Sequence, residues 1–276
     1  MLLFLLPSLI GVICFYLIPY VQMIYYSVIN NLIQKNFIGL DNYASLLRNR
    51  SFKIAFANMA ILSITGVCTI VPLSLSFALL LSNDKKIFKL VRSINLLPLF
   101  VPAACVIMIW RIMFDKQGAV NQLLQMLGIS NIDWLKTGWG RIAVLLMYLW
   151  KNTGLNTIVF MGALASVPKE QIEVAKLEGA GKWQIFWLVK LRNIMPSIMF
   201  TAVIALINSY KLFREVYLLT GDYPQEELYL LSHFLNNMLR KIEYGKLSAA
   251  SILYALATAL IMAVMFWTDK KREEQE

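Results

Sequence analysis

Charged and metal-binding residues are scarce in this chain of 276 residues. Only 15% of the residues are Asp, Glu, Lys or Arg, and there are one histidine, His233, and three cysteines. Soluble domains carry about 25% charged residues, so the composition excludes an ordinary soluble domain. A single histidine leaves no His-based metal site. Cys14, Cys68 and Cys105 all fall in apolar runs, where we expect small packing residues and neither a disulfide nor a metal site.

Several functional signatures are also absent. The sequence has no Gly-x-x-x-x-Gly-Lys-Ser/Thr loop for phosphates, so we expect no ATP chemistry, no cofactor and no enzymatic activity in the chain itself. No internal repeat is evident, which disfavours a secondary transporter built from two related halves. The net charge of +10 comes without a nucleic-acid-binding motif, and basic residues that flank membrane spans explain it better.

Apolar residues dominate instead, at 59% of the chain with a mean hydropathy of +0.62. We therefore expect an all-α membrane protein with one transmembrane domain over residues 1–276. The first apolar run is uncharged as far as Gln34, too long for a signal peptide, so it is expected to be a span. A crossing helix needs about 20 apolar residues. Six runs qualify, centred on Leu3–Val28, Ala57–Leu81, Ile94–Phe114, Ile142–Leu164, Ile194–Leu212 and Leu247–Trp267.

The basic residues near the span ends give an orientation. The short loop Ser82–Arg92, which includes Lys85, and the tail Lys270–Arg272 are rich in Lys and Arg, and short basic flanks stay in the cytoplasm. Both termini are therefore predicted to be cytoplasmic. Leucines at helical spacing in Leu228–Leu239 predict an amphipathic helix at the outer face, packed against the bundle.

A charged, glycine-broken segment at residues 166–192 interrupts the apolar pattern. Pro168 suits the first position of a helix, and Glu173 lies in its first turns, where the helix dipole favours negative charge. Gly179 and Gly181 then break the helix. Such a segment cannot lie in hydrocarbon, because its charges and turn backbone need water or a protein partner. The pattern predicts two short helices that project from the membrane and dock a soluble protein.

The second of these helices carries aromatic residues at helical spacing. Trp183, Phe186 and Trp187 offer apolar anchors to a groove on a partner. The alternative is a helix on the membrane surface with a tryptophan belt.

The projecting segment resembles the "EAA" signature of permease subunits in bacterial ATP-binding-cassette (ABC) importers. Four signature positions match, namely Glu173, Ala175, Gly179 and Ala180. Val174 stands in place of Ala, Glu178 replaces Asp conservatively, and Pro196 matches a later proline. Arg192 stands where the family usually has a proline, which leaves the end of the second helix open.

Other stretches resemble the carbohydrate branch of these importers, the maltose and glycerol-phosphate type. They are Phe37–Tyr43, Trp150–Gly154, Lys211–Gly221 and Tyr244–Ala250. The turn Gly221-Asp-Tyr-Pro224 departs from the Gly-Gly-Pro of that branch at Asp222 and Tyr223.

The resemblance implies the type I ABC importer permease fold, with six transmembrane helices and a cytoplasmic coupling-helix loop. It implies a second permease subunit, two ABC ATPase subunits and an extracytoplasmic solute-binding protein as partners, in the bacterial cytoplasmic membrane. The resemblance also implies which residues meet the ATPase: Glu173, Ala175, Glu178, Gly179, Ala180, Gly181, Trp183 and Phe186. The implied function is half of a pathway for a sugar or oligosaccharide.

Polar residues inside the fourth and fifth spans indicate where a solute could pass. A Lys at the centre of a span costs roughly 2.5–3.5 kcal/mol on insertion scales, so such groups face protein or water. The candidates are Lys151, Asn152, Asn156, Asn208 and Tyr210. The amides could bind sugar hydroxyls and the tyrosine could stack on a sugar ring, or the amides could bond between helices. A non-sugar solute, a secondary transporter without an ATPase and a membrane scaffold stay open as alternatives.

Overall fold

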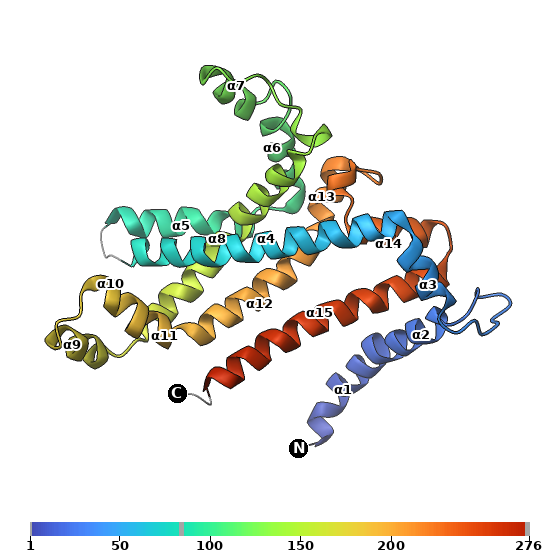
Figure 1. Ribbon diagram of the computed structural model, residues 1–276, viewed down its shortest axis with the longest axis horizontal. Coiled ribbons are helices and arrows are strands. Elements are labelled where there is room, and N and C mark those ends of the chain that lie inside the picture. The colour runs from blue at the N-terminus through green and yellow to red at the C-terminus, as the bar shows by residue number, and fades with distance from the viewer. Residues whose placement is uncertain (1, 83–85, 274–276) are drawn as a thin grey trace. The chain divides into compact units, whose positions relative to one another are not determined.

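The computed structural model describes residues 2–82 and 86–273, and most of these residues are helical (Figure 1). Within them the sole β feature is an isolated bridge between Ile29 and Phe37. The chain divides into two compact units, Met1–Asn58 with Tyr229–Val264, and Met59–Leu228 with Met265–Glu276. Lys85, one of the basic residues used to orient the chain, lies outside the described residues.

The first unit contains the N-terminal helices and the last long helix. Its elements are α1 (Leu2–Val12), the π-helix η1 (Ile13–Leu17), α2 (Ile18–Ser27), α3 (Asp41–Arg48), the start of α4 (Arg50–Leu81), α14 (Leu231–Arg240) and most of α15 (Tyr244–Glu273). The amphipathic helix predicted at Leu228–Leu239 is α14, and its Phe234 packs on Phe52 of α4 with ring centroids 5.4 Å apart. Of the predicted leucine stripe, Leu228 and Leu231 are buried, Leu235 is half-buried and Leu239 is exposed.

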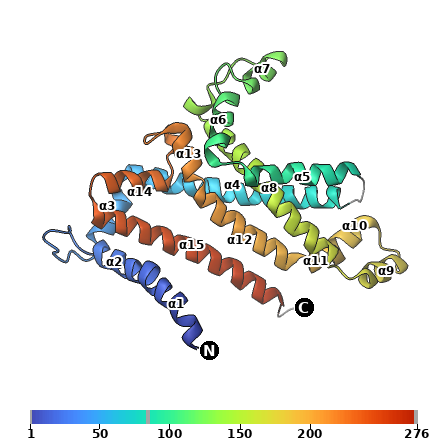
Figure 2. The same cartoon turned by 180° about the vertical axis from the view of Figure 1, so that it is seen from behind.

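The second unit holds the remaining helices. They are the rest of α4, α5 (Lys86–Phe100), α6 (Ala103–Met113), α7 (Ala119–Met126), η2 (Trp134–Lys136), α8 (Gly140–Ala165), α9 (Lys169–Leu177), α10 (Lys182–Gln184), the π-helix η3 (Ile185–Lys190), α11 (Leu191–Asn193), α12 (Met195–Lys211), α13 (Phe213–Thr220) and η4 (Glu226–Leu228). Figure 2 shows α9 and α10 beyond the ends of α8 and α12.

Four helical stretches among the described residues are long and apolar enough to cross a membrane. They are Leu5–Ser27, Arg50–Leu81, Met195–Thr220 and Tyr244–Thr268. The predicted fourth span, Ile142–Leu164, lies within the 26-residue helix α8, whose central polar residues set it apart from these four. The predicted count of six spans is therefore not confirmed: four stretches qualify, or five if one bent helix pair counts as a span.

The predicted span Ile94–Phe114 is not one helix. Residues Lys86–Phe100 and Ala103–Met113 form two helices bent by 105° relative to each other. Pro102 explains the break, because proline lacks an amide hydrogen and disfavours helical geometry at the residue before it. The two helices can still act as one broken span or as a re-entrant pair.

The three cysteines were predicted to be small packing residues, but they are not buried within the chain. Cys14, Cys68 and Cys105 are free thiols, and all three are exposed. Apolar helices in a membrane need not bury their small side chains within one subunit, because lipid or another chain can cover them.

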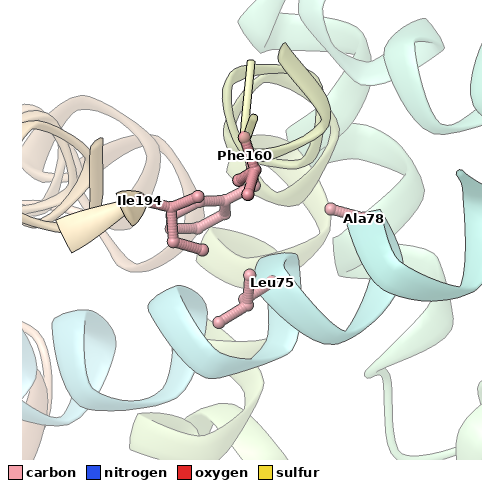
Figure 3. Close-up of a cluster of buried hydrophobic side chains, with 5 residues drawn as sticks. Leu75, Ala78, Phe160 and Ile194 are labelled. Atoms are coloured by element: carbon pink, nitrogen blue, oxygen red, sulfur yellow. The ribbon is translucent and has the colours of Figure 1, made fainter. Parts of the chain in front are cut away.

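A cluster of buried apolar side chains joins three helices at the base of the projecting segment (Figure 3). Leu75 and Ala78 come from α4 and Phe160 from α8, with Val167 just before α9 and Ile194 just before α12. Phe160 is fully buried and Ile194 nearly so. We call these five residues the anchor cluster. It holds both ends of the segment from residue 168 to residue 193.

Candidate functional site

The first helix of the projecting segment, α9, ends in a turn that requires glycine. The amide of Gly179 donates to the carbonyl of Lys176 at 3.0 Å, and the amide of Ala180 donates to that of Ala175 at 2.9 Å. This pair of bonds is the Schellman arrangement, which places its glycine in the left-handed region. Gly179 has φ +83° and open space around it, so the requirement comes from the backbone. A residue with a side chain costs roughly 1–2 kcal/mol there.

The second helix begins at Lys182, with Gly181 as its N-cap, and runs on to Asn193 through α10, η3 and α11. The amide of Gly181 donates to Oε1 of Gln184 at 2.8 Å, which satisfies one of the unpaired amides at the helix start. Arg192 stands within α11, so the helix continues past the position where the signature has a proline. Nδ2 of Asn193 donates to Oε1 of Gln171 at 2.8 Å and ties the second helix to the first.

The predicted coupling residues differ in how they are presented. Five of the eight are exposed, namely Glu173, Glu178, Gly179, Gly181 and Trp183, and three are half-buried, namely Ala175, Ala180 and Phe186. Trp183 is 72% exposed, whereas Phe186 packs against the anchor cluster. Their rings stack with centroids 5.8 Å apart. Trp183 is thus the free aromatic tip, and Phe186 is the support beneath it.

A groove of about 630 Å³ runs between the two helices of the segment. Its walls are Glu170, Gln171, Val174, Ala175, Glu178, Leu188, Val189, Arg192 and Asn193. Sequence reasoning missed Val174 and Leu188, which are 53% and 69% exposed. The four-residue spacing of Glu170, Val174 and Glu178 is the signal that could have identified this face. The groove therefore offers exposed apolar positions bordered by acidic residues on one helix and Arg192 on the other.

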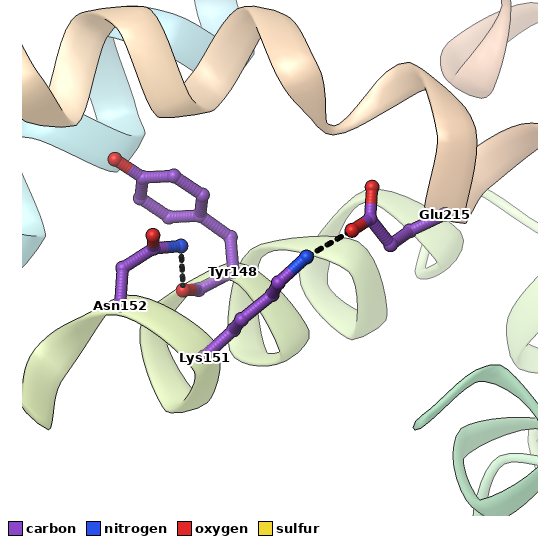
Figure 4. Close-up of polar contacts among 4 residues, drawn as sticks. All are labelled: Tyr148, Lys151, Asn152 and Glu215. Carbon is purple, nitrogen blue, oxygen red and sulfur yellow. Dashed lines mark hydrogen bonds and ion pairs between the residues drawn. The ribbon is translucent and has the colours of Figure 1, made fainter. Parts of the chain in front are cut away.

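The central lysine of α8 has a partner that sequence reasoning did not name. Nζ of Lys151 forms an ion pair with Oε1 of Glu215, in the first turn of α13 (Figure 4). The side chain of Glu215 is 5% exposed and that of Lys151 is 31% exposed. Lys151 therefore has a carboxylate as its counter-charge within the chain.

The other predicted solute-path residues differ in burial and in hydrogen bonding. Nδ2 of Asn152 donates to the carbonyl of Tyr148 in the same helix at 2.8 Å (Figure 4). Asn156 is buried, and its Nδ2 has no hydrogen-bond partner among the described residues. Asn208 and Tyr210 on α12 are half-buried. A direct link between α8 and α12 comes instead from Tyr148, whose Oη donates to the carbonyl of Ala205 at 2.7 Å.

Helix α8 also passes very close to α5. A Cβ added to Gly154 would lie 2.0 Å from the carbonyl oxygen of Asn95 and 2.8 Å from its carbon. These are backbone atoms, so they cannot move aside as a flexible side chain can. Gly154 therefore permits the contact that fixes α8, and with it Lys151, against α5.

Residues 2–82 and 86–273 contain no group of three His, Cys, Asp or Glu side chains that could hold an ion.

Known proteins resemble this chain over most of its length. The family model described as "Binding-protein-dependent transport system inner membrane component" matches residues 70–273. The trehalose/maltose transport system permease protein MalF of Thermococcus litoralis is 29% identical over 256 residues, which cover 91% of this chain and 87% of that protein.

Solved structures agree with the fold. A chain of a bacterial ABC transporter involved in the import of the acidic polysaccharide alginate superposes with a TM-score of 0.84 and 24% identity, covering 97% of this chain and 94% of that one. A chain from the alginate transporter in complex with its pentasaccharide-bound periplasmic protein gives 0.82 and 25% identity, covering 95% and 91%. The helical arrangement is thus that of an ABC importer permease.

Proposed function

Because the chain belongs to the family of inner membrane components of binding-protein-dependent transport systems, we propose that it forms half of the pathway of an ATP-driven importer for a sugar or oligosaccharide. The observation that carries the proposal is the projecting helix pair, α9 to α11, held at both ends by the anchor cluster. The similarity to a trehalose/maltose permease supports the solute class.

The helix pair transmits ATP binding to the membrane helices in this proposal. Trp183, the turn at Gly179 and the exposed Glu173 and Glu178 meet a cleft of an ABC ATPase subunit. The partner ATPase subunits carry out the hydrolysis. Since both ends of the segment lie in the anchor cluster, a displacement of the pair reaches α4, α8 and α12 together.

Six crossings account for the topology. They are the four apolar stretches, α8, and α5 with α6 as one broken span. Both termini and the projecting pair then lie in the cytoplasm of a bacterial cell, with residues 35–50 and 222–246 outside. α8 can cross despite its polar residues because its lysine is paired and its amides face protein or water.

The assembly pairs this chain with a second permease subunit and two ATPase subunits, and a solute-binding protein outside delivers the sugar. Solved alginate transporters include a complex with a periplasmic protein, which supports that partner. Lys151, Asn152, Asn156, Asn208 and Tyr210 remain the proposed solute-path residues on this chain.

Purification of the tagged chain from its native membrane tests the proposal. We expect a second permease chain and two ATPase copies to co-purify. The reconstituted complex should hydrolyse ATP faster when its binding protein carries a sugar. Transport by a stable complex that lacks ATPase subunits would instead identify a secondary transporter, and stimulation by a non-sugar solute alone would identify an importer of another class.

A further inference from the structure

Six helices of the second unit share a single acidic residue. Helices α4, α5, α6, α8, α12 and α13 carry no Asp or Glu other than Glu215. Basic residues occur mainly near the ends of these helices, whereas Lys151 is the twelfth of the 26 residues of α8. With a rise of 1.5 Å per residue, Lys151 lies about 17 Å from one end of α8 and about 21 Å from the other.

The sole acid and the central lysine are bound to each other. Figure 4 shows the lysine side chain reaching across from α8 to the carboxylate of Glu215 on α13. Glu215 lies three residues after the break between α12 and α13 at Leu212. Oε2 of Glu215 is buried and has no hydrogen-bond partner among the described residues. The pair therefore has no net charge. Lys151 keeps donor hydrogens that are partly exposed, whereas the buried Glu215 acts on a solute only through its charge.

Resting on the function proposed above, we propose that the Lys151–Glu215 pair is a charge filter that favours neutral oligosaccharides over oligouronates. A sugar hydroxyl can accept a hydrogen bond from the ammonium of Lys151, whose side chain is partly exposed. A uronate carboxylate must compete with Glu215 for Lys151 while being repelled by the glutamate. In a medium of low dielectric this repulsion outweighs what one added hydrogen bond returns.

The likeness to an alginate importer does not oppose this proposal. That structure is 24% identical, so the likeness concerns the fold and not the charge of the solute. What matters is whether a lysine in the path has its own counter-charge, and here it has one.

The test measures direct binding of trigalacturonate to the assembled complex in lipid nanodiscs, without the binding protein. Saturation-transfer NMR supplies the affinities, so that the measured preference belongs to the membrane subunits. Glu215→Gln leaves Lys151 charged and should raise the affinity for trigalacturonate roughly tenfold over wild type, as expected for one unpaired charge in a partly screened site. The gain should shrink as salt is added.

Two neutral pairs serve as controls. The double variant Lys151→Gln with Glu215→Gln and the exchange Lys151→Glu with Glu215→Lys both restore zero net charge, and both should show the low wild-type affinity. An equal gain in the double variant, or no gain in Glu215→Gln, would overturn the filter. Should Glu215→Gln not assemble, high uronate affinity in the exchange variant, or failure of both neutral pairs to assemble, would overturn it too. Sugar-stimulated ATPase activity of the wild-type complex separately reports whether the proposed function itself holds.

Discussion

At the scale of the residue, glycines do different jobs in this chain. Gly179 supplies a positive φ at the tip of the projecting segment, whereas Gly154 supplies space between two helices. A sequence reader sees the same letter in both places. The first role could be inferred from the signature around it, but the second depends on the approach of Asn95, which no local pattern announces.

We expect Gly179→Asp to leave the complex assembled in the membrane and to abolish sugar-stimulated ATP hydrolysis. Aspartate strains the left-handed turn and adds bulk and charge where the ATPase would dock. Gly128→Asp is the matched control, because Gly128 has φ +77° and equally open surroundings but lies outside the projecting segment. Normal uptake by Gly179→Asp would show that the residue is only a surface turn.

Gly154→Ala should reduce assembly and lower the Tm of the purified complex, because the new methyl group would overlap the backbone of Asn95. Such overpacking typically costs about 1–3 kcal/mol. Gly162→Ala in the same helix has nothing within 4 Å of its new Cβ and should leave the Tm unchanged or slightly raised. Thermal melts followed by size-exclusion chromatography compare the two. Equal Tm values for Gly154→Ala and Gly162→Ala would show that α5 and α8 can move apart without loss of stability.

At the scale of the element, the sequence predicted the positions of the long helices and the shape of the projecting segment, because those depend on hydropathy, proline and glycine. It could not predict the 105° angle between α5 and α6, since hydropathy carries no information about the angle between successive helices. Nor could it pair Lys151 with Glu215, because the partners are 64 residues apart in the sequence and lie on different helices. It also treated Trp183 and Phe186 alike, although tertiary packing turns one outward and the other inward.

Two alanine substitutions in the second helix of the segment should distinguish the roles of Trp183 and Phe186. Trp183→Ala is expected to weaken association with the ATPase subunits and leave the Tm of the permease unchanged, because the indole is mostly exposed. Phe186→Ala should lower the Tm, because its ring packs on the anchor cluster. Pull-down of the ATPase and thermal melts measure the two effects. A drop in Tm with Trp183→Ala would contradict the assignment of the tip.

At the scale of the whole molecule, the proposed orientation in the membrane can be tested by thiol labelling at two exposed positions. In a background without Cys14, Cys68 and Cys105, which are all exposed and would react, we expect Gln225→Cys to be labelled by an impermeant thiol reagent from outside intact cells. Lys182→Cys should react only after the cells are opened. Both positions are exposed in the isolated chain, so burial within it does not confound the result. Labelling of Lys182→Cys but not of Gln225→Cys in intact cells would show that the chain has the opposite orientation.

The anchor cluster has a mechanical consequence. A densely packed group of side chains transmits strain and does not absorb it. Val167 and Ile194 pack in the same cluster as Leu75, Ala78 and Phe160. The projecting helices are therefore joined rigidly to the membrane helices at both of their ends. A force applied at Trp183 should therefore reach α4, α8 and α12 together, and we expect these three helices to rotate as a group.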